Sequence, residues 1–280
     1  MTLREQGPLA RALARGPALY FYSARPAGDP VAAAGLVHGY GEYGARYERV
    51  MDAWAERGIA SFALDLRGHG RAEGRRGYCR RFEDYIDDVA ELERLTQSST
   101  RGVPMFLFGH SFGGLVAASF AAARPGPWRG LMLSAPLLAI AMDVPPLKRL
   151  AGKLASRLLP TLALPNGIRS EDITHDAELA RAYEKDPLVF HIATARWFSE
   201  VGRAQRRAFD RASSLRIPLY VVMGTEDRIA SYERARALFD AAGAIDKTWD
   251  SRPGLFHEVL NEPEWRAIAG RLADFMLAHV

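Results

Sequence analysis

The stretch Met105–Pro125, MFLFGHSFGGLVAASFAAARP, passes from a short apolar run through Gly-His-Ser-Phe-Gly into an alanine-rich helical pattern. This order predicts a buried strand, a very tight turn and a helix, with Ser111 at the corner. Gly109 and Gly113 would let the strand and the helix approach closely there. The pattern Gly-x-Ser-x-Gly between a strand and a helix is the nucleophile elbow, in which a strained turn pushes the serine hydroxyl out of the sheet. We therefore predict that Ser111 is a catalytic nucleophile.

Short apolar runs alternate with helical patterns on both sides of this corner. Runs typical of strands fall at residues 18–23, 31–40, 59–66, 103–109, 129–136, 217–224 and 247–251. Helical patterns fall at residues 46–58, 81–97, 113–123, 232–243 and 263–280. Such a β-α-β-α alternation predicts an α/β fold with a mostly parallel central sheet, right-handed crossovers and helices on both faces.

The alternation is interrupted once along the chain. Residues 137–205 are helical in pattern, punctuated by prolines and rich in Leu and Arg, and the strand pattern resumes only after them. We therefore predict a single domain in which residues 1–136 and 206–280 form the α/β core. Residues 137–205 would form a helical cap inserted into that core.

Composition narrows the class of protein. Of the 280 residues, 48% are hydrophobic and 25% charged, and 37 Lys and Arg against 33 Asp and Glu give a formal net charge of +4. That excess is too small and too scattered to indicate nucleic-acid binding. No apolar run reaches the ~18 residues of a transmembrane helix and no signal peptide is recognisable, so a cytoplasmic location is expected. The sequence has no HExxH motif and no Cys-His cluster, so neither a metal nor another cofactor is expected, and nothing in it indicates an oligomeric state.

The single cysteine, Cys79, cannot form an intramolecular disulfide. It lies among arginines in RRGYCRRF, and arginines would lower the pKa of a thiol. A catalytic cysteine also needs a histidine partner, and none can be assigned to it. Cys79 is therefore expected to be an ordinary loop residue.

A serine hydroxyl becomes a good nucleophile only when a base takes its proton, and histidine suits that task near neutral pH. Among the seven histidines, His110 adjoins Ser111 and should point its side chain away from it, whereas His175 and His191 lie in the predicted cap. His257, in RPGLFHEVLNEPE, lies between the last strand pattern and the last helix. Its loop should return to the carboxyl edge of the sheet, so we predict that His257 is the base.

The base in turn needs a carboxylate that holds its tautomer. The segment VVMGTEDRIA offers Glu226 and Asp227 just after a predicted strand. We predict that Asp227 is the acid of the triad and that Glu226 is a solvated loop charge. The order Ser111, Asp227, His257 is the order found in α/β-hydrolases.

The carbonyl under attack develops negative charge, which two backbone N–H groups should stabilise. Phe112, at the start of the helix after Ser111, would supply one of them. The second should come from the glycine-rich loop His38-Gly39-Tyr40-Gly41, with Tyr40 as the donor. The alternative is that this loop is a plain glycine-rich turn.

Several segments together carry a resemblance to a known family. They are HGYGEYGARY, DLRGHGRAEG, GHSFGG, KDPL and GTEDRI followed by FHE. From about Tyr20 to the last helix, the chain resembles the monoacylglycerol lipase and lysophospholipase family of α/β-hydrolases. The resemblance implies the same triad and the same two oxyanion donors, no cofactor, and a structural role for the loop Asp65–Gly74. It also reaches relatives described as peptidases, but nothing in the sequence is typical of a site for a free amino terminus.

These observations predict a serine ester hydrolase that cleaves single-chain lipid esters, of the monoacylglycerol or lysophospholipid type, through an acyl-enzyme. Two alternatives are a general carboxylesterase for short soluble esters and a non-catalytic α/β-hydrolase scaffold that binds a ligand. The acyl-chain length and the head group are left open, because the predicted cap is distinctive in this chain.

A basic amphipathic pattern is predicted at residues 146–159, PLKRLAGKLASRLL. Leu147, Leu150, Leu154 and Leu158 recur at steps of three and four, with Lys148, Arg149, Lys153 and Arg157 on other faces. Such a helix could lie on a membrane or micelle as a peripheral contact. The alternative is that its leucines pack inward over the acyl pocket.

Overall fold

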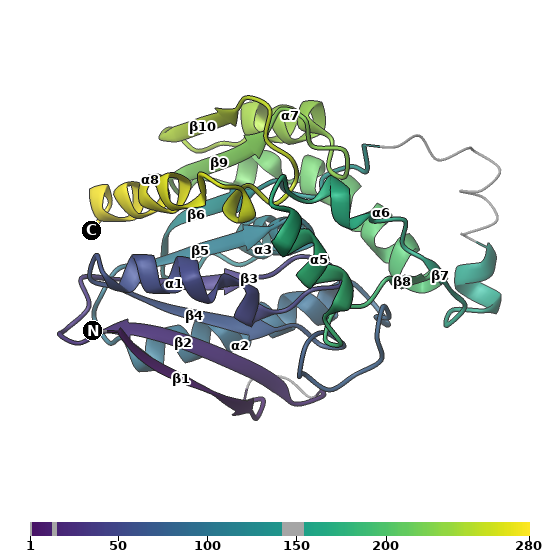
Figure 1. The fold of residues 1–280 in the computed structure, drawn as a ribbon, viewed down its shortest axis with the longest axis horizontal. Helices are drawn as coiled ribbons and strands as arrows, with labels where there is room; N and C mark the ends of the chain where they lie inside the picture. The colour runs from purple at the N-terminus through teal and green to yellow at the C-terminus, as the bar shows by residue number, and fades with distance from the viewer. Residues whose placement is uncertain (1, 13–15, 142–153) are drawn as a thin grey trace.

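The computed structural model describes residues 2–12, 16–141 and 154–280. Its centre is an eight-stranded sheet with the order β1-β2-β4-β3-β5-β6-β9-β10 (Figure 1). The strands are β1 (Thr2–Leu9), β2 (Leu19–Pro26), β3 (Ala32–Val37), β4 (Ile59–Asp65), β5 (Met105–His110), β6 (Trp128–Ser134), β9 (Leu219–Gly224) and β10 (Lys247–Arg252). All neighbours from β4 to β10 pair in parallel, whereas β2 runs antiparallel to β4 and to β1. The predicted α/β fold with a mostly parallel sheet is thereby confirmed.

Helices cover both faces of this sheet, as predicted. In Figure 1, α1 (Glu48–Ala55) and α8 (Trp265–Ala278) lie in front of the sheet, while α2 (Glu83–Ser99) and α3 (Phe112–Ala123) lie behind it. The buried side chains divide in the same way. Those of α1 and α8 belong to one hydrophobic cluster, and those of α2, α3 and α7 (Tyr232–Ala241) belong to another. Short 3₁₀ helices lie at Gly44–Tyr47, Ser170–Asp172, Ala212–Ser214 and Val259–Asn261.

The parallel strands bring distant loops together. The carboxyl ends of β3, β5, β9 and β10 lie on one edge of the sheet because these strands run in the same direction. Ligands of open α/β sheets bind at that edge. The loops that follow these strands carry the residues predicted to form the site.

Strand β1 was not anticipated from the sequence. Its residues TLREQGPL are mostly exposed, because β1 is an edge strand that pairs only with β2. An exposed edge strand shows little of the apolar alternation by which buried strands are recognised. Gly7 and Pro8 further weaken the pattern, since both residue types are depleted in strands.

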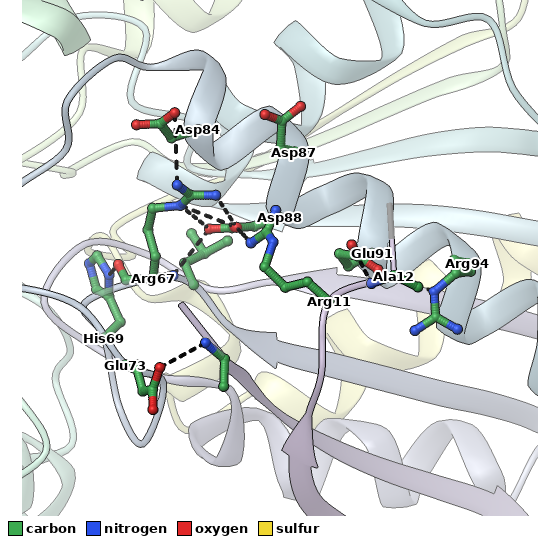
Figure 2. Close-up of polar contacts among 12 residues, drawn as sticks. Arg11, Ala12, Arg67, His69, Glu73, Asp84, Asp87, Asp88, Glu91 and Arg94 are labelled. Carbon is green, nitrogen blue, oxygen red and sulfur yellow. Dashed lines mark hydrogen bonds and ion pairs between the residues drawn. The ribbon is translucent and has the colours of Figure 1, made fainter. Parts of the chain in front are cut away.

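Ion pairs and hydrogen bonds connect the N-terminal segment and the loop after β4 to α2, as Figure 2 shows. Arg11 forms an ion pair with the buried carboxylate of Asp88 in α2. Arg67, in the loop after β4, reaches the same carboxylate with hydrogen bonds of 2.6 and 2.9 Å. The Asp88 carboxylate is thus a common anchor for two segments that are far apart in the sequence.

Between β6 and β9 lie the residues predicted to form a helical cap. The described elements there are β7 (Ala163–Pro165), α5 (Ala177–Lys185), β8 (Ile192–Thr194) and α6 (Ala195–Asp210), together with a helical turn at 154–158. The small β7–β8 sheet was missed, because three-residue strands are too short to show a period. Of the amphipathic pattern predicted at 146–159, residues 146–153 lie outside the described residues.

Candidate active site

Ser111 lies between β5 and α3 in a strained backbone conformation, with φ of 52° and ψ of −119°. Residues other than glycine rarely adopt a positive φ. The flanking glycines are required by space: a Cβ on Gly109 would lie 2.4 Å from the carbonyl oxygen of Gly113, and a Cβ on Gly113 only 2.2 Å from that of Val37. The chain therefore forms the tight strand–helix corner at which a serine side chain is presented at the edge of the sheet.

Three predicted residues form one hydrogen-bonded chain at this corner. His257 Nε2 lies 2.8 Å from Ser111 Oγ, and His257 Nδ1 lies 2.8 Å from Asp227 Oδ2. The other carboxylate oxygen of Asp227 accepts hydrogen bonds from the backbone N–H groups of Ile229 and Ala230, at 2.8 and 2.9 Å. A proton on Nδ1, held by Asp227, leaves Nε2 as the acceptor for the serine hydroxyl.

The neighbouring acid, Glu226, is placed differently. Its side chain is exposed, whereas the side chain of Asp227 is fully buried. Its backbone N–H donates to the carbonyl of Leu255 at 3.1 Å. Glu226 thus belongs to the solvated surface of the loop.

The surroundings of His257 favour its protonated form. Burial of the ring alone would lower its pKa, but the adjacent Asp227 carboxylate, with Glu258 and Glu42 farther away, outweighs burial and raises the pKa of His257 above its ordinary value. An imidazole with a raised pKa is a stronger base and holds a transferred proton better. The arrangement can take a proton from Ser111 and stabilise the resulting imidazolium.

The loop after β3 borders the serine. A Cβ on Gly39 would lie 3.3 Å from the Cβ of Ser111, so the backbone of this loop runs beside the corner. The ring of Tyr40 stands edge-on to the ring of Phe112 at 5.9 Å, and its hydroxyl donates to the Ile192 carbonyl at 2.8 Å. Phe112 begins α3, so its backbone N–H has no acceptor within the helix. The two residues predicted as oxyanion donors therefore lie side by side at Ser111.

A buried ion-pair network, missed in the sequence analysis, adjoins this loop. Glu42 Oε1 accepts hydrogen bonds from the backbone N–H of Gly39 at 2.5 Å and from the Tyr47 hydroxyl at 2.8 Å. Its other oxygen lies 2.7 Å from Arg46 Nη1. Arg46 also pairs with Glu258, the residue after His257. The network therefore joins the loop after β3 to the loop that carries His257.

His110 lies beside the base His257. Its Nδ1 is 3.1 Å from Ser134 Oγ, and its ring centroid lies 4.9 Å from that of His257. Burial, followed by the nearby charge of His257, lowers the pKa of His110 to about 4. Its side chain is therefore neutral at pH 7 and flanks the base, a placement that the prediction of a side chain turned away from Ser111 did not include.

The predicted effect of the arginines on Cys79 is wrong. Cys79 is buried, and burial, followed by the charges of Glu200 and Asp84, raises the pKa of its thiol well above the usual range. The arginines that flank it in the sequence do not compensate for this desolvation. A neutral, buried thiol behaves as a small apolar side chain.

Within residues 2–12, 16–141 and 154–280, no group of three or more His, Cys, Asp or Glu side chains is arranged to hold a metal ion. In the same ranges, no helix combines the length and the apolar character needed to cross a bilayer.

The chain is similar in sequence and fold to known lipases. Residues 28–264 match the family Hydrolase_4, described as serine aminopeptidase, S33. The chain is 30% identical to a monoacylglycerol lipase of Mycolicibacterium smegmatis, with 91% of each chain covered, and 30% identical to the phospholipase YtpA of Bacillus subtilis, with 84% of this chain and 91% of the relative covered. The crystal structure of the Paleococcus ferrophilus monoacylglycerol lipase superposes with a TM-score of 0.84 at 29% identity, over 94% of this chain and 99% of the other.

Proposed function

This chain belongs to the Hydrolase_4 family of α/β-hydrolases, and we propose that it uses Ser111 to cleave single-chain lipid esters of the monoacylglycerol or lysophospholipid type. Its likeness to monoacylglycerol lipases over most of both chains makes it a carboxylic ester hydrolase. One observation above all supports the proposed role of Ser111. It is the unbroken hydrogen-bonded chain from Ser111 through His257 to Asp227, at a strained corner on the sheet edge.

In the first half of the proposed reaction, Ser111 Oγ attacks the ester carbonyl while His257 Nε2 takes the hydroxyl proton. Asp227 keeps the imidazole in the required tautomer and stabilises its positive charge. The backbone N–H groups of Phe112 and Tyr40 receive the negative charge that develops on the carbonyl oxygen. When the tetrahedral intermediate collapses, His257 returns the proton to the leaving alcohol and the acyl group stays on Ser111.

In the second half, a water molecule takes the place of the alcohol. His257 removes one of its protons as the water attacks the acyl-enzyme, and the same oxyanion donors act again. Collapse of the second intermediate releases the fatty acid and returns the proton to Ser111. Apart from the ester and water, which are the substrates, the residues named here supply the groups that this scheme uses.

We also propose that residues 137–205 form a cap over this sheet edge, inserted between two parts of one α/β core. The Tyr40 hydroxyl bonds to the carbonyl of Ile192 in β8, and the Trp197 ring of α6 lies 5.3 Å from the ring of Phe112. These contacts place β8 and α6 against the predicted oxyanion residues. A cap in this position would separate the ester from bulk water.

Peripheral contact with a membrane or micelle is the remaining part of the proposal. Large apolar side chains are exposed along residues 154–164 of the cap, at Leu154, Leu158, Leu159, Leu162 and Leu164. Single exposed leucines are ordinary, but a run of them on one segment is typical of a surface that meets lipid. A single-chain substrate could then pass from the lipid phase to Ser111 without crossing water.

Covalent labelling tests the catalytic role of Ser111. A fluorophosphonate probe should add once to the wild-type protein, and Ser111→Ala should abolish both labelling and ester hydrolysis while its far-UV circular dichroism stays that of the wild type. Equal labelling of the alanine variant would overturn the assignment.

A substrate panel tests the proposed substrate class. It should contain p-nitrophenyl esters and monoacylglycerols of graded chain length, with an amino-acid p-nitroanilide as the peptidase control. A maximum of kcat/KM for medium or long acyl chains supports the proposal. A maximum for acetate or butyrate esters would indicate a general carboxylesterase instead. The absence of both labelling and hydrolysis would indicate a binding scaffold.

A further inference from the structure

A groove of about 540 Å³ lies between the loop that follows β6 and the side of α6. Five arginines line it, contributed by the 154–158 helical turn, by α6 and by α7: Arg157, Arg196, Arg203, Arg206 and Arg234. Among the described residues that line it, none is an aspartate or glutamate. A concave surface lined by one sign of charge concentrates ligands of the opposite sign.

Little of this positive charge is neutralised by the protein itself. Glu200, a buried residue of α6, pairs closely with Arg203 and lies 3.7 Å from Arg196. A second carboxylate, Asp210, lies in an adjoining hollow that Arg206 also lines. Arg207 lines the same hollow but is itself paired with Glu83. The five guanidinium groups of the groove against the carboxylates of Glu200 and Asp210 therefore leave an excess of three positive charges.

Three of the arginines are available to a ligand. Within the described part of the chain, Arg157, Arg206 and Arg234 form no ion pair with a carboxylate. Arg234 stacks over the ring of Phe209 at 3.8 Å, which fixes the plane of its guanidinium without using its hydrogen-bond donors. All three side chains are exposed to the solvent in the groove.

Two sets of contacts connect the groove with the corner that carries Ser111. On one side, the backbone N–H of Leu137 donates a hydrogen bond to the Ser111 carbonyl at 2.9 Å. The side chain of Gln205 donates to the Leu137 carbonyl at 3.0 Å. Gln205 and Leu138 both line the groove. On the other side, Trp197 contacts the ring of Phe112. The two neighbours of Trp197 in α6 also line the groove.

The remaining lining is amphipathic. Leu138, Ile140 and Phe198 supply apolar surface, and the hydroxyls of Ser156 and Ser199 supply hydrogen-bond partners among the arginines. Guanidinium groups match the geometry of phosphate oxygens and bind them through two parallel hydrogen bonds. A phosphate with nearly two negative charges also suits the excess of three positive charges better than a fatty-acid carboxylate with one.

We propose that this arginine groove binds the phosphate of a single-chain lipid ester, so that the chain prefers lysophospholipids with a terminal phosphate over neutral monoacylglycerols. This inference rests on the proposed ester hydrolysis at Ser111 and adds the head group to it. The phosphate lies among the arginines while the ester is presented at the elbow.

A ratio of rates tests the preference. We expect kcat/KM for lauroyl lysophosphatidate to exceed that for monolauroylglycerol, with both lipids kept below their micellar concentrations. Arg206→Gln/Arg234→Gln should lower this ratio by about tenfold or more, because charge-assisted contacts are lost. The matched control, Arg101→Gln/Arg129→Gln, removes the same charge from exposed positions before β5 and at the start of β6, at the opposite edge of the sheet, and should keep the ratio. Fluorophosphonate titration counts the competent sites of each variant.

A binding measurement separates this inference from the proposed activity. The ether analogue of lysophosphatidate has no ester to cleave, and it should bind the wild type and the control variant but bind the groove variant at least about tenfold more weakly. If this difference appears while no ester is hydrolysed, the groove assignment stands and the proposed activity fails. If esters are hydrolysed but both the rate ratio and the ether affinity are the same in all three proteins, the groove assignment is overturned.

Two further results would also overturn it. Inorganic phosphate that bound as tightly as the ether lipid, with the same dependence on Arg206 and Arg234, would make the groove a site for a free anion. Arginine-dependent binding to anionic phosphatidylglycerol vesicles, without binding of the monomeric ether lipid, would assign the arginines to a membrane surface.

Discussion

Arg46 and Glu258 form a bidentate ion pair in the interior, with Nη1–Oε1 and Nη2–Oε2 distances of 2.8 Å each. Arg46 Nη1 also lies 2.7 Å from Glu42, whose other oxygen holds the backbone of Gly39. Burial alone would raise the pKa of Glu258, but the charge of Arg46 outweighs it and holds that pKa below its usual value. One guanidinium therefore joins the loop of the predicted oxyanion donor to the loop of His257.

Removing this guanidinium should destabilise the protein strongly. Arg46→Ala leaves the buried carboxylates of Glu42 and Glu258 without their cationic partner, and breaking a buried pair costs about 3–5 kcal/mol of unfolding free energy. Urea denaturation at pH 7 measures the loss. The control is Arg4→Ala, which breaks an ion pair with Asp52 on the surface and should cost about 1 kcal/mol or less. Equal losses in the two variants would contradict a central role for the Arg46 network.

The same variant should respond to pH in a defined direction. A carboxyl group whose pKa is lowered in the folded state stabilises that state above its unfolded pKa, and this contribution is lost as the pH falls through the folded value. The lowered pKa of Glu258 therefore predicts that the wild-type advantage over Arg46→Ala shrinks on acidification below pH 5. Urea titrations of both proteins between pH 7 and pH 4 measure it, and an advantage that grew on acidification would contradict the assignment.

The pH dependence of labelling reports on His257. Only neutral imidazole can accept the serine proton, so its raised pKa predicts an acid limb in the fluorophosphonate rate at a higher pH than an ordinary histidine would give. Asp227→Asn removes the main cause of that rise. We expect the limb to move to lower pH and the rate to fall by up to about 10⁴-fold.

The adjacent carboxylate supplies the control for that experiment. Glu226→Gln removes a charge from an exposed position one residue away and should keep both the rate and the acid limb. A loss of labelling in Glu226→Gln with near-normal labelling in Asp227→Asn would show that the acid was assigned to the wrong residue.

Short stretches of sequence predicted those features of the fold and the site that depend on residues close together in the chain. The elbow could be predicted because Gly109 and Gly113 flank Ser111 in a short stretch, and a Cβ on Gly109 would meet the carbonyl oxygen of Gly113 in that same stretch. The crowding of Gly113 by the Val37 carbonyl, far earlier in the chain, has no such local signal. The Arg46–Glu258 pair could not be predicted, because its members are 212 residues apart and a pattern shows no distance in space. Glu42 and Arg46 both lie in HGYGEYGARY, and their spacing of four residues was the one signal of an ion pair. For Cys79, the neighbouring arginines misled because burial determines the thiol pKa.

Gly113→Ala tests how strictly the corner requires glycine. An added Cβ would lie 2.2 Å from the Val37 carbonyl oxygen and 2.3 Å from that of His38, and both are backbone atoms that cannot turn aside. We expect a loss of several kcal/mol in unfolding free energy and a large drop in fluorophosphonate labelling. Urea denaturation and labelling measure the two effects.

The control for this substitution is Gly270→Ala in α8. A Cβ there meets nothing within 4 Å, so the change should stabilise the protein by about 0.5–1 kcal/mol, as expected for glycine replaced in a helix. Loss of stability in both variants alike would show that the crowding at Gly113 is not the cause.

The exposed leucines of the cap lead to the last prediction. Leu158 is 70% exposed, and Leu164 stands in β7, which pairs with β8. Arg157 lies next to Leu158 in the sequence and is also exposed. Apolar side chains beside a cation can enter a lipid interface while the cation meets anionic head groups. Of the four leucines whose alternative was to pack inward over an acyl pocket, Leu154 and Leu158 are open to solvent, and the other two lie outside the described residues.

Leu158→Asp should therefore weaken binding to lipid surfaces. We expect the wild type to co-sediment with vesicles of phosphatidylglycerol and phosphatidylcholine at low salt, and the variant to remain largely in the supernatant, because a carboxylate is costly to bring into the apolar part of an interface. The matched control is Ile245→Asp, which makes the same change of charge at a fully exposed apolar residue before β10 and should sediment like the wild type. Hydrolysis of a soluble p-nitrophenyl ester should be equal in all three proteins, since neither position touches the triad. Equal sedimentation of the two variants, or no sedimentation of the wild type, would exclude this segment as the membrane contact.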